Sequence, residues 1–244
     1  MAADGLSLEI REVDQAEGIG LIEYLLSPVK DPWSVFRKAT RRPSLRLFLL
    51  AALIVSALGA AGGVIVASRI EYRFVNLPEG VDPAQIQAAM RVFSGPAFVG
   101  ATSFVSGMVV ALLAGGLVHV VARLAGGEPV SLSTTLTGFG AVYLTEGVKS
   151  LIDVVGLLQA LPERIVITID LANPYSARAG DVAKQLQATP VSLAMSGLVA
   201  VWQWFLLTEL MSTVFGLSRG KSAAAAAILV LLKFIPLVAG LALW

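Results

Sequence analysis

Charged side chains lie inside apolar segments of this chain, and they are the residues best placed to do chemistry. Glu146, Lys149 and Asp153 all fall within the apolar segment 134–158. At about 100° per residue, these three side chains lie within roughly 60° of one another on a helix, so they share one face. Such residues pair with each other or mark a pathway for protons, ions or solutes. Two more charged residues lie in later apolar segments, Glu209 and Lys233.

The depth of each charged residue predicts how these residues pair. Depth is counted from the cytoplasmic end of each segment, and the orientation is argued from the basic residues later in this section. With a rise of about 1.5 Å per residue, Glu146 and Lys233 both lie roughly 17 Å deep. Lys233 therefore has a matching carboxylate in Glu146, with Glu209, near about 10 Å, as the second choice. Lys149 and Asp153 are four residues apart and can pair on their own helix.

Two interpretations of this charged network stay open. Three acids against two bases leave one carboxylate unpaired or protonated, which a proton site requires. The alternative is that ion pairs fix how the third, fourth and fifth apolar segments meet. A charge at the bilayer centre costs about 2.5–3.5 kcal/mol, so in either case the charged face must contact protein or water.

The composition indicates a membrane protein and excludes several kinds of site. Of the 244 residues, 56% are hydrophobic and 14% are charged, whereas soluble domains average about 25% charged residues. A net charge of +1 gives no general attraction for nucleic acid. The chain has no cysteine and one histidine, His119, and it shows no nucleophile and base set and no nucleotide-binding glycine pattern. We therefore predict no metal, no cofactor and no enzymatic activity.

Five apolar stretches are each long enough to cross a hydrocarbon core of about 30 Å. The predicted fold is an all-α membrane protein in which residues 47–244 form a bundle of five transmembrane helices. Residues 1–46 would form a cytoplasmic tail and a short interfacial helix, with Asp31 as its cap and Pro32 in its first turn. The predicted spans are residues 47–67, 97–122, 134–158, 191–215 and 222–244.

The two long connections between these spans carry local signals of their own. Residues 82–93 favour an amphipathic helix, with Asp82 as the cap and Pro83 at the first position. The sequence RIVITID, residues 164–170, has strand character. Residues 181–187 are compatible with a short helix.

Small residues recur on two of the predicted spans. Gly59 and Gly63 form a GxxxG pattern in the first span, where another helix backbone can approach closely. The second span carries a small residue at every fourth position. We interpret these residues as a helix-packing seam rather than a ligand groove. The small residues of the second span are Ser103, Gly107, Ala111 and Gly115.

Basic residues set the predicted orientation, because cytoplasmic flanks carry an excess of Lys and Arg. Ten basic residues lie before the first span or in the two short connections, against six in the two long connections. We therefore expect a multi-pass protein of the cell membrane with its N-terminus in the cytoplasm and its C-terminus outside. The ten are Arg11, Lys30, Arg37, Lys38, Arg41, Arg42, Arg46, Arg123, Arg219 and Lys221. The six are Arg69, Arg73, Arg91, Arg164, Arg178 and Lys184.

Three segments of the chain resemble the Yip family (Ypt/Rab-interacting proteins) in its prokaryotic form. The segment LLSPVKDPWSVFRKATRRPSL is similar to the stretch that precedes the first span in that family. The segment HVVARLAGGEPVSLSTTLTGFGAVYL resembles the stretch between its second and third spans, and VWQWFLLTELMSTVFGLSRGKSAAAAAILV resembles its later IWxxxLxxxGLxxxxGLSxxKA segment. The resemblance implies five spans, a cytoplasmic N-terminus and, from eukaryotic relatives, a role in vesicle trafficking and in organising membranes.

The chain departs from that family pattern in two places. Eukaryotic relatives bind prenylated small GTPases, but their DLxGP motif and a long cytoplasmic arm are missing here, which puts a small-GTPase partner in doubt. A YxxxP sequence that is frequent in the third span is replaced by Tyr143 and Glu146 with no proline. The family pattern therefore does not interpret the charged network.

Two functions from different classes follow from these observations. The first is a non-catalytic membrane organiser or assembly subunit, in contact with the lipid bilayer and with another membrane protein or a second copy of itself. The packing seam and the resemblance favour this function. The second is a transport component for a proton, an ion or a small solute, which only the charged third and fifth spans favour.

Overall fold

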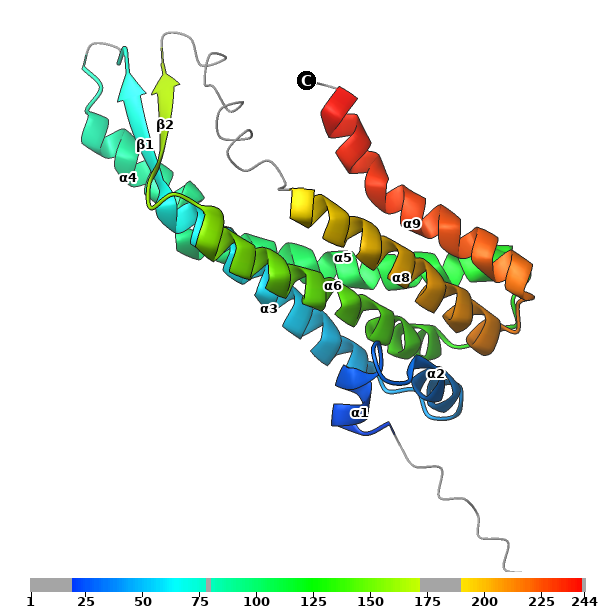
Figure 1. Ribbon diagram of the computed structural model, residues 1–244. Coiled ribbons are helices and arrows are strands. Elements are labelled where there is room, and N and C mark those ends of the chain that lie inside the picture. Colours follow the sequence, from blue (N-terminus) through cyan, green and yellow to red (C-terminus); the bar gives the residue numbers. More distant parts are fainter. Residues whose placement is uncertain (1–18, 78–79, 172–189, 243–244) are drawn as a thin grey trace, which may run out of the picture.

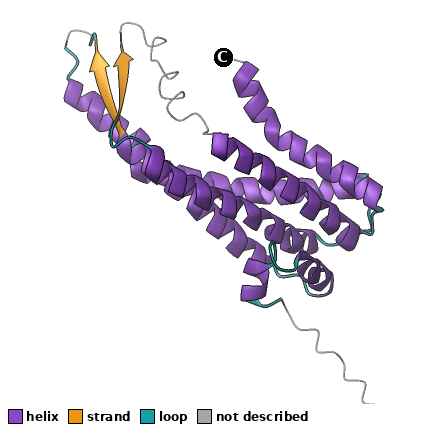
Figure 2. Cartoon of the chain, viewed as in Figure 1, coloured by secondary structure: helices purple, strands orange, loops and turns teal. Residues whose placement is uncertain are grey.

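The computed structural model describes residues 19–77, 80–171 and 190–242, and most of them are helical (Figure 1; Figure 2). Long helices cover the five predicted apolar segments, whereas the predicted tail at residues 1–18 and the predicted helix at 181–187 lie outside the described residues. In chain order the elements are α1 (Leu21–Leu26), α2 (Pro32–Arg41), α3 (Leu45–Arg69), β1 (Ile70–Val75), α4 (Pro83–Ser94), α5 (Pro96–Leu124), α6 (Leu132–Ala160), β2 (Ile165–Asp170), α8 (Pro190–Phe215) and α9 (Arg219–Ala242).

Three stretches of the described residues are long and apolar enough to cross a membrane, Leu45–Arg69, Pro83–Leu124 and Ala194–Phe215. They correspond to α3, to α4 together with α5, and to most of α8, and so include the first, second and fourth predicted spans. α6 is not among them, because threonines and three charged residues lie within it. α9 is not among them either, because the part whose side chains are described, residues 219–233, is short and carries three basic residues.

The long helices lie side by side and give the molecule two distinct ends (Figure 1). At what we call the N-terminal end, α1 and α2 pack against the bundle. The connection after α5 meets the connection after α8 there, where the Glu128 amide donates to the Phe215 carbonyl at 2.8 Å. At what we call the strand end lie β1, β2, α4 and the last turns of α9. The N-terminal helices and the end of α9 are thus at opposite ends of the bundle.

Capping residues explain where several helices begin. Asp31 accepts a hydrogen bond from the backbone amide three residues further on (3.2 Å), and Pro32 opens α2, which confirms the predicted start. Asp82 accepts from the amide two residues further on (2.8 Å), ahead of Pro83 at the start of α4, as predicted. The Ser131 hydroxyl caps α6 in the same way.

β1 and β2 form a two-stranded parallel sheet, which corrects the all-α class in detail. Ile70 pairs with Ile165, and Val75 pairs with Asp170. β2 confirms the strand character of RIVITID, whereas β1 lies where we predicted a loop. The signal for β1 is present in the sequence IEYRFV, where apolar and charged residues alternate. The strands can pair in parallel because α3 and α6, which precede them, pack along each other and both lead to the strand end.

Most of the largest fully buried side chains lie toward the N-terminal end, and Ile165 of β2, at the strand end, is an exception. Tyr24 of α1, Phe36 of α2 and Phe48 of α3 are completely buried, and so are Leu210 and Phe215 near the end of α8. α4, at the opposite end, has no buried residue. The core is therefore densest where α1 and α2 close the bundle.

Candidate functional site

A hydrogen-bonded cluster joins three helices in the middle of the bundle. Lys233 of α9 forms an ion pair with Glu146 of α6, the partner that the sequence predicted. Gln203 of α8 links both charges, because its Nε2 donates to Glu146 Oε1 (2.6 Å) and its Oε1 accepts from Lys233 Nζ (3.1 Å). The same Nε2 also lies 2.9 Å from Thr145 Oγ1. The cluster thus ties α6, α8 and α9 together.

Gln203 is the member of this cluster that the sequence analysis missed. Its side chain is buried, with 7% of its surface exposed. A buried amide needs partners for both its donor and its acceptor. A single glutamine in the apolar run VWQWF is therefore the signal that could have identified it.

The other pair of the charged network is also present. Lys149 and Asp153 form an ion pair one turn apart on α6, as predicted from their spacing. Their side chains are about a quarter exposed, at 23% and 29%. This pair lies toward the strand end from Glu146 and does not join the cluster around Gln203.

Lys233 takes Glu146, its first predicted partner, and Glu209, the second choice, has a different partner. Its Oε2 accepts a hydrogen bond from Trp33 Nε1 of α2 at 3.1 Å. The reason is positional, because Glu209 lies two turns from the end of α8, where α2 packs on the bundle. The third carboxylate of the network therefore contacts the N-terminal helices rather than the cluster around Gln203.

Some small residues of the predicted seam lie at close contacts between α3 and α5, and the others do not. A Cβ placed on Gly107 would lie 2.6 Å from Ser56 Oγ of α3, and one on Gly63 would lie 3.1 Å from Ser103 Oγ of α5. α3 and α5 therefore approach closely at these two points. Gly59 differs, because nothing lies within 4 Å of a Cβ placed there. The remaining members face α6 or the core, with Gly115 against Leu136 and Phe139 and with Ala111 fully buried.

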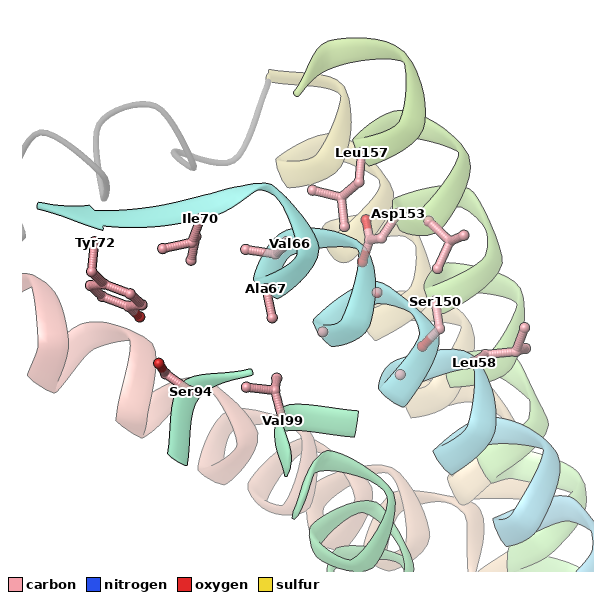
Figure 3. Close-up of a pocket in the computed structure, with 14 residues that line it drawn as sticks. Leu58, Val66, Ala67, Ile70, Tyr72, Ser94, Val99, Ser150, Asp153 and Leu157 are labelled. Atoms are coloured by element: carbon pink, nitrogen blue, oxygen red, sulfur yellow. The ribbon is translucent and has the colours of Figure 1, made fainter. Parts of the chain in front are cut away.

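Two adjoining cavities lie beside the charged network. An inner cavity of about 350 Å³ lies between α3, α5, α6, α8 and α9, and Glu146, Gln203 and Lys233 form much of its polar wall. An outer cavity of about 440 Å³ lies toward the strand end, between α3, β1, the end of α4, α5 and α6 (Figure 3). Both cavities have mostly apolar walls. Gly59 and Ser150 line both of them, so the two cavities meet at these residues.

The N-terminal helices attach to the bundle through polar contacts as well as apolar ones. The buried Tyr24 hydroxyl donates to the Thr137 carbonyl at 2.8 Å, and Thr137 Oγ1 accepts from the Ser44 amide at 2.8 Å. Lys38 forms an ion pair with Glu23 at 2.9 Å, and this hydrogen bond is the main cause that lowers the pKa of the Glu23 carboxyl. α1 and α2 are thus fixed to each other and to α6.

The ionisable residues that remain show no arrangement for metal chemistry within the described residues. No group of three or more His, Asp or Glu side chains is close enough there to hold a metal ion. The single histidine, His119, lies with Nδ1 2.9 Å from Thr135 Oγ1 and with its ring 5.8 Å from that of Phe215. It belongs to the packed N-terminal end.

Comparison with known protein families identifies one domain along nearly the whole chain. The family model of the Yip1 domain matches residues 22–241. Comparisons with curated proteins and with solved structures returned no significant match. The match covers every helix from α2 to α8 and all but the ends of α1 and α9. The protein therefore belongs to the Yip family and is a membrane protein of the Yip type.

Proposed function

We propose that this chain is a five-span, non-catalytic membrane organiser that gathers anionic lipid and membrane proteins around a rigid bundle. In this proposal α3, α5, α6, α8 and α9 each cross the bilayer. The N-terminal end faces the cytoplasm, and the C-terminus lies outside. The partners are the bilayer and either another membrane protein or a second copy of the chain.

The observation that carries the proposal is a contrast between the charges inside the bundle and those at the N-terminal end. Two ion pairs and the Trp33 hydrogen bond engage all five charged residues of the network. Charges matched in this way fix how helices meet. The basic residues of the N-terminal end instead face outward. The exposed ones are Lys30, Arg37, Arg41, Arg42, Arg46, Arg123, Arg219 and Lys221.

α2 presents its basic face at a fixed position. Its apolar residues Val35, Phe36 and Ala39 are buried, and α2 packs on α6 and α8. Because this apolar side contacts protein, α2 meets lipid through its basic side and Trp33 rather than by inserting into the bilayer. A basic residue near an anionic membrane surface contributes about 1 kcal/mol of attraction. The exposed arginines therefore favour anionic headgroups of the cytoplasmic leaflet.

The proposed orientation agrees with two independent features. The described basic residues before α3, from Lys30 to Arg42, and those of the two short connections belong to segments at the N-terminal end of the molecule, where cytoplasmic flanks are expected (Figure 1). The end of α9 lies at the strand end, as an odd number of spans requires. α6 and α9 would then cross the bilayer with their charges held in the ion pairs Glu146–Lys233 and Lys149–Asp153.

Lipid enrichment around the purified protein tests the organiser role. Thr40→Cys labelled with a fluorescent donor is reconstituted into vesicles that contain acceptor-labelled phosphatidylserine or phosphatidylcholine. We expect stronger energy transfer to phosphatidylserine, and we expect the difference to shrink as salt rises. The double substitution Arg37→Gln with Arg41→Gln should clearly reduce the difference. The control Arg73→Gln with Arg91→Gln, at the strand end, should keep it. Equal transfer to both lipids in the unmodified protein would contradict the proposal.

A second experiment separates the organiser from a transport component. The chain has no cysteine, so Ser150→Cys places a single thiol where the two cavities meet. A closed bundle predicts slow reaction of this thiol with a water-soluble maleimide, and proton flux no higher than in empty vesicles. Rapid labelling together with a flux that Glu146→Gln abolishes would replace the organiser by a transporter.

A further inference from the structure

The space at Gly59 is an interruption in an otherwise close contact between two helices. Ser56, Gly59 and Gly63 lie on one face of α3. Ser56 contacts Gly107 of α5, and Gly63 contacts Ser103 of α5. Between these contacts, nothing lies within 4 Å of a Cβ placed on Gly59. Gly59 is exposed and lines both cavities, so the glycine leaves free space where the outer and inner cavities adjoin.

We propose that the two adjoining cavities bind one acyl chain of a surrounding membrane lipid. The chain would enter at the outer cavity, pass over Gly59 and end in the inner cavity. The headgroup would remain at the strand end. This inference rests on the proposed transmembrane placement of the bundle, but it does not depend on the organiser role.

The walls of the cavities favour a hydrocarbon occupant. Both are lined mainly by apolar side chains, and volumes of about 440 Å³ and 350 Å³ lie within the range of ligand pockets, about 300–1,000 Å³. Each charged residue on the walls faces an opposite charge, because Glu146 pairs with Lys233 and Asp153 pairs with Lys149. A charged ligand would have to disrupt one of these pairs, which is costly in a membrane interior. An uncharged chain leaves both intact.

The mouth of the outer cavity carries groups suited to the polar part of a lipid. Figure 3 shows the Tyr72 and Ser94 side chains on opposite walls, with their hydroxyl groups directed into the space between them. Tyrosine is enriched at the level of lipid headgroups, where its ring is apolar and its hydroxyl is wet. The Tyr72 hydroxyl can donate to an ester carbonyl there. The apolar residues Val66, Val99 and Leu157 continue the wall inward.

The neighbourhood of the cavities also favours lipid as the source. Val110 and Leu117 of α5 line the inner cavity while 55% and 43% of their surface is exposed. In the proposed bundle such exposed apolar side chains on α5 face the hydrocarbon core. Acyl chains are therefore present at the edge of the site at high concentration.

Photolabelling with lipids that carry a reactive group at two depths tests this inference. The full-length protein is reconstituted with phosphatidylcholine that carries a diazirine either near the ester or at the chain end, irradiated, digested and mapped by mass spectrometry. We expect the ester-proximal probe to label Val99 or Leu157 in the outer cavity. The chain-end probe should label Phe139 or Val142 in the inner cavity, which are 6% and 2% exposed and out of reach of lipid on the outer surface.

The variant Gly59→Leu should close the passage. It should lose the chain-end adducts at Phe139 and Val142 and retain the ester-proximal adducts in the outer cavity. Gly116→Leu is the matched control, because a Cβ at Gly116 also has nothing within 4 Å and this residue lines neither cavity. The control should keep the full pattern.

Several outcomes would overturn the inference. Adducts confined to exposed residues such as Val105 and Leu113 in the unmodified protein would do so, whether or not Gly59→Leu folds. Inner-cavity adducts that persist in a folded Gly59→Leu variant would exclude this route. Rapid labelling of Ser150→Cys by a water-soluble maleimide would show a water-filled passage and would also overturn it.

Discussion

The N-terminal end and the strand end of this bundle are built on different principles. At the N-terminal end, α1 and α2 add a layer whose aromatic residues Tyr24 and Phe36 are completely buried. At the strand end, α4 buries no residue, and the space between α3, α5 and α6 holds a cavity of about 440 Å³. The comparison teaches that one end of the molecule supplies stability and the other has room for a ligand.

Residue size explains part of this difference. α3 carries large apolar residues in its first half and the sequence GAAGG, residues 59–63, in its second half. Phe48 fills the contact with α6, whereas Gly59 leaves open space beside α5. The same helix therefore packs closely at one end and lines both cavities at the other.

The same phenylalanine substitution at the two ends should give the largest contrast. Phe36→Ala removes a completely buried ring from α2, and we expect a loss of about 3–5 kcal/mol in the free energy of unfolding. Phe93→Ala in α4 removes a ring that is 66% exposed and touches Phe98 edge-on, so its loss should stay below about 1.5 kcal/mol. Chemical denaturation in detergent measures both. Similar losses would show that the two ends are equally packed.

Charge reversal tests whether the cluster around Gln203 stabilises the protein, as the packed N-terminal end does. Glu146→Lys or Lys233→Glu alone places like charges together, and we expect either to lower the thermal unfolding temperature clearly. The loss should stay below the roughly 3–5 kcal/mol of a fully buried pair, because the Lys233 side chain is 42% exposed.

The double variant should recover most of that loss. The Gln203 amide can rotate and offer its oxygen and its nitrogen to the exchanged partners. Thermal unfolding of the two single variants and the double variant forms a complete cycle. No recovery in the double variant would show that the pairing of Glu146 with Lys233 does not stabilise the protein.

Removing one tyrosine hydroxyl group at each end compares the buried hydrogen bonds of the two ends. Tyr24→Phe removes the buried hydrogen bond to the Thr137 carbonyl and should cost about 0.5–1.5 kcal/mol. Tyr72→Phe, at the mouth of the outer cavity, should leave the unfolding free energy in detergent unchanged. An equal cost for both would mean that the strand end is also held by buried polar contacts.

The smallest expected effect is a pH dependence confined to the N-terminal end. The pKa of Glu23 is lowered from its usual value of 4.5, mainly by Lys38, so its ion pair stabilises the protein above that value. This contribution should be lost as the pH falls through the lowered pKa. Both side chains are about one third exposed, so the change is small. Hydrogen exchange of α1 and α2 at neutral and acidic pH measures it, and Glu23→Gln should remove the difference.

Much of the fold could be predicted from the sequence because long apolar segments are a strong signal for membrane helices. The starts of α2 and α4 followed from Asp31 and Asp82, each ahead of a proline. β1 was missed because a six-residue strand in a connection has a weak signal, and its partner lies about a hundred residues away.

The site was predicted in part, because the sequence gives the depth of each charged residue but not the direction in which its side chain points. Depth along each helix was enough to pair Glu146 with Lys233, since both lie at one height. Depth does not show how each helix is rotated about its axis. Glu209 was therefore named as a second choice for Lys233, although it accepts a hydrogen bond from Trp33 of α2. The open space at Gly59 was not predictable either, because a GxxxG pattern does not reveal which of its glycines meets a neighbouring helix.

Labelling of single cysteines from the two sides of sealed vesicles tests the central claim most directly, namely that five spans place the packed end in the cytoplasm. The native chain has no cysteine to remove. We predict that Thr40→Cys and Ser218→Cys react with an impermeant reagent only from the cytoplasmic side, and that Glu163→Cys and Trp244→Cys react only from the outside. Reaction of Thr40→Cys and Trp244→Cys from the same side would contradict the account.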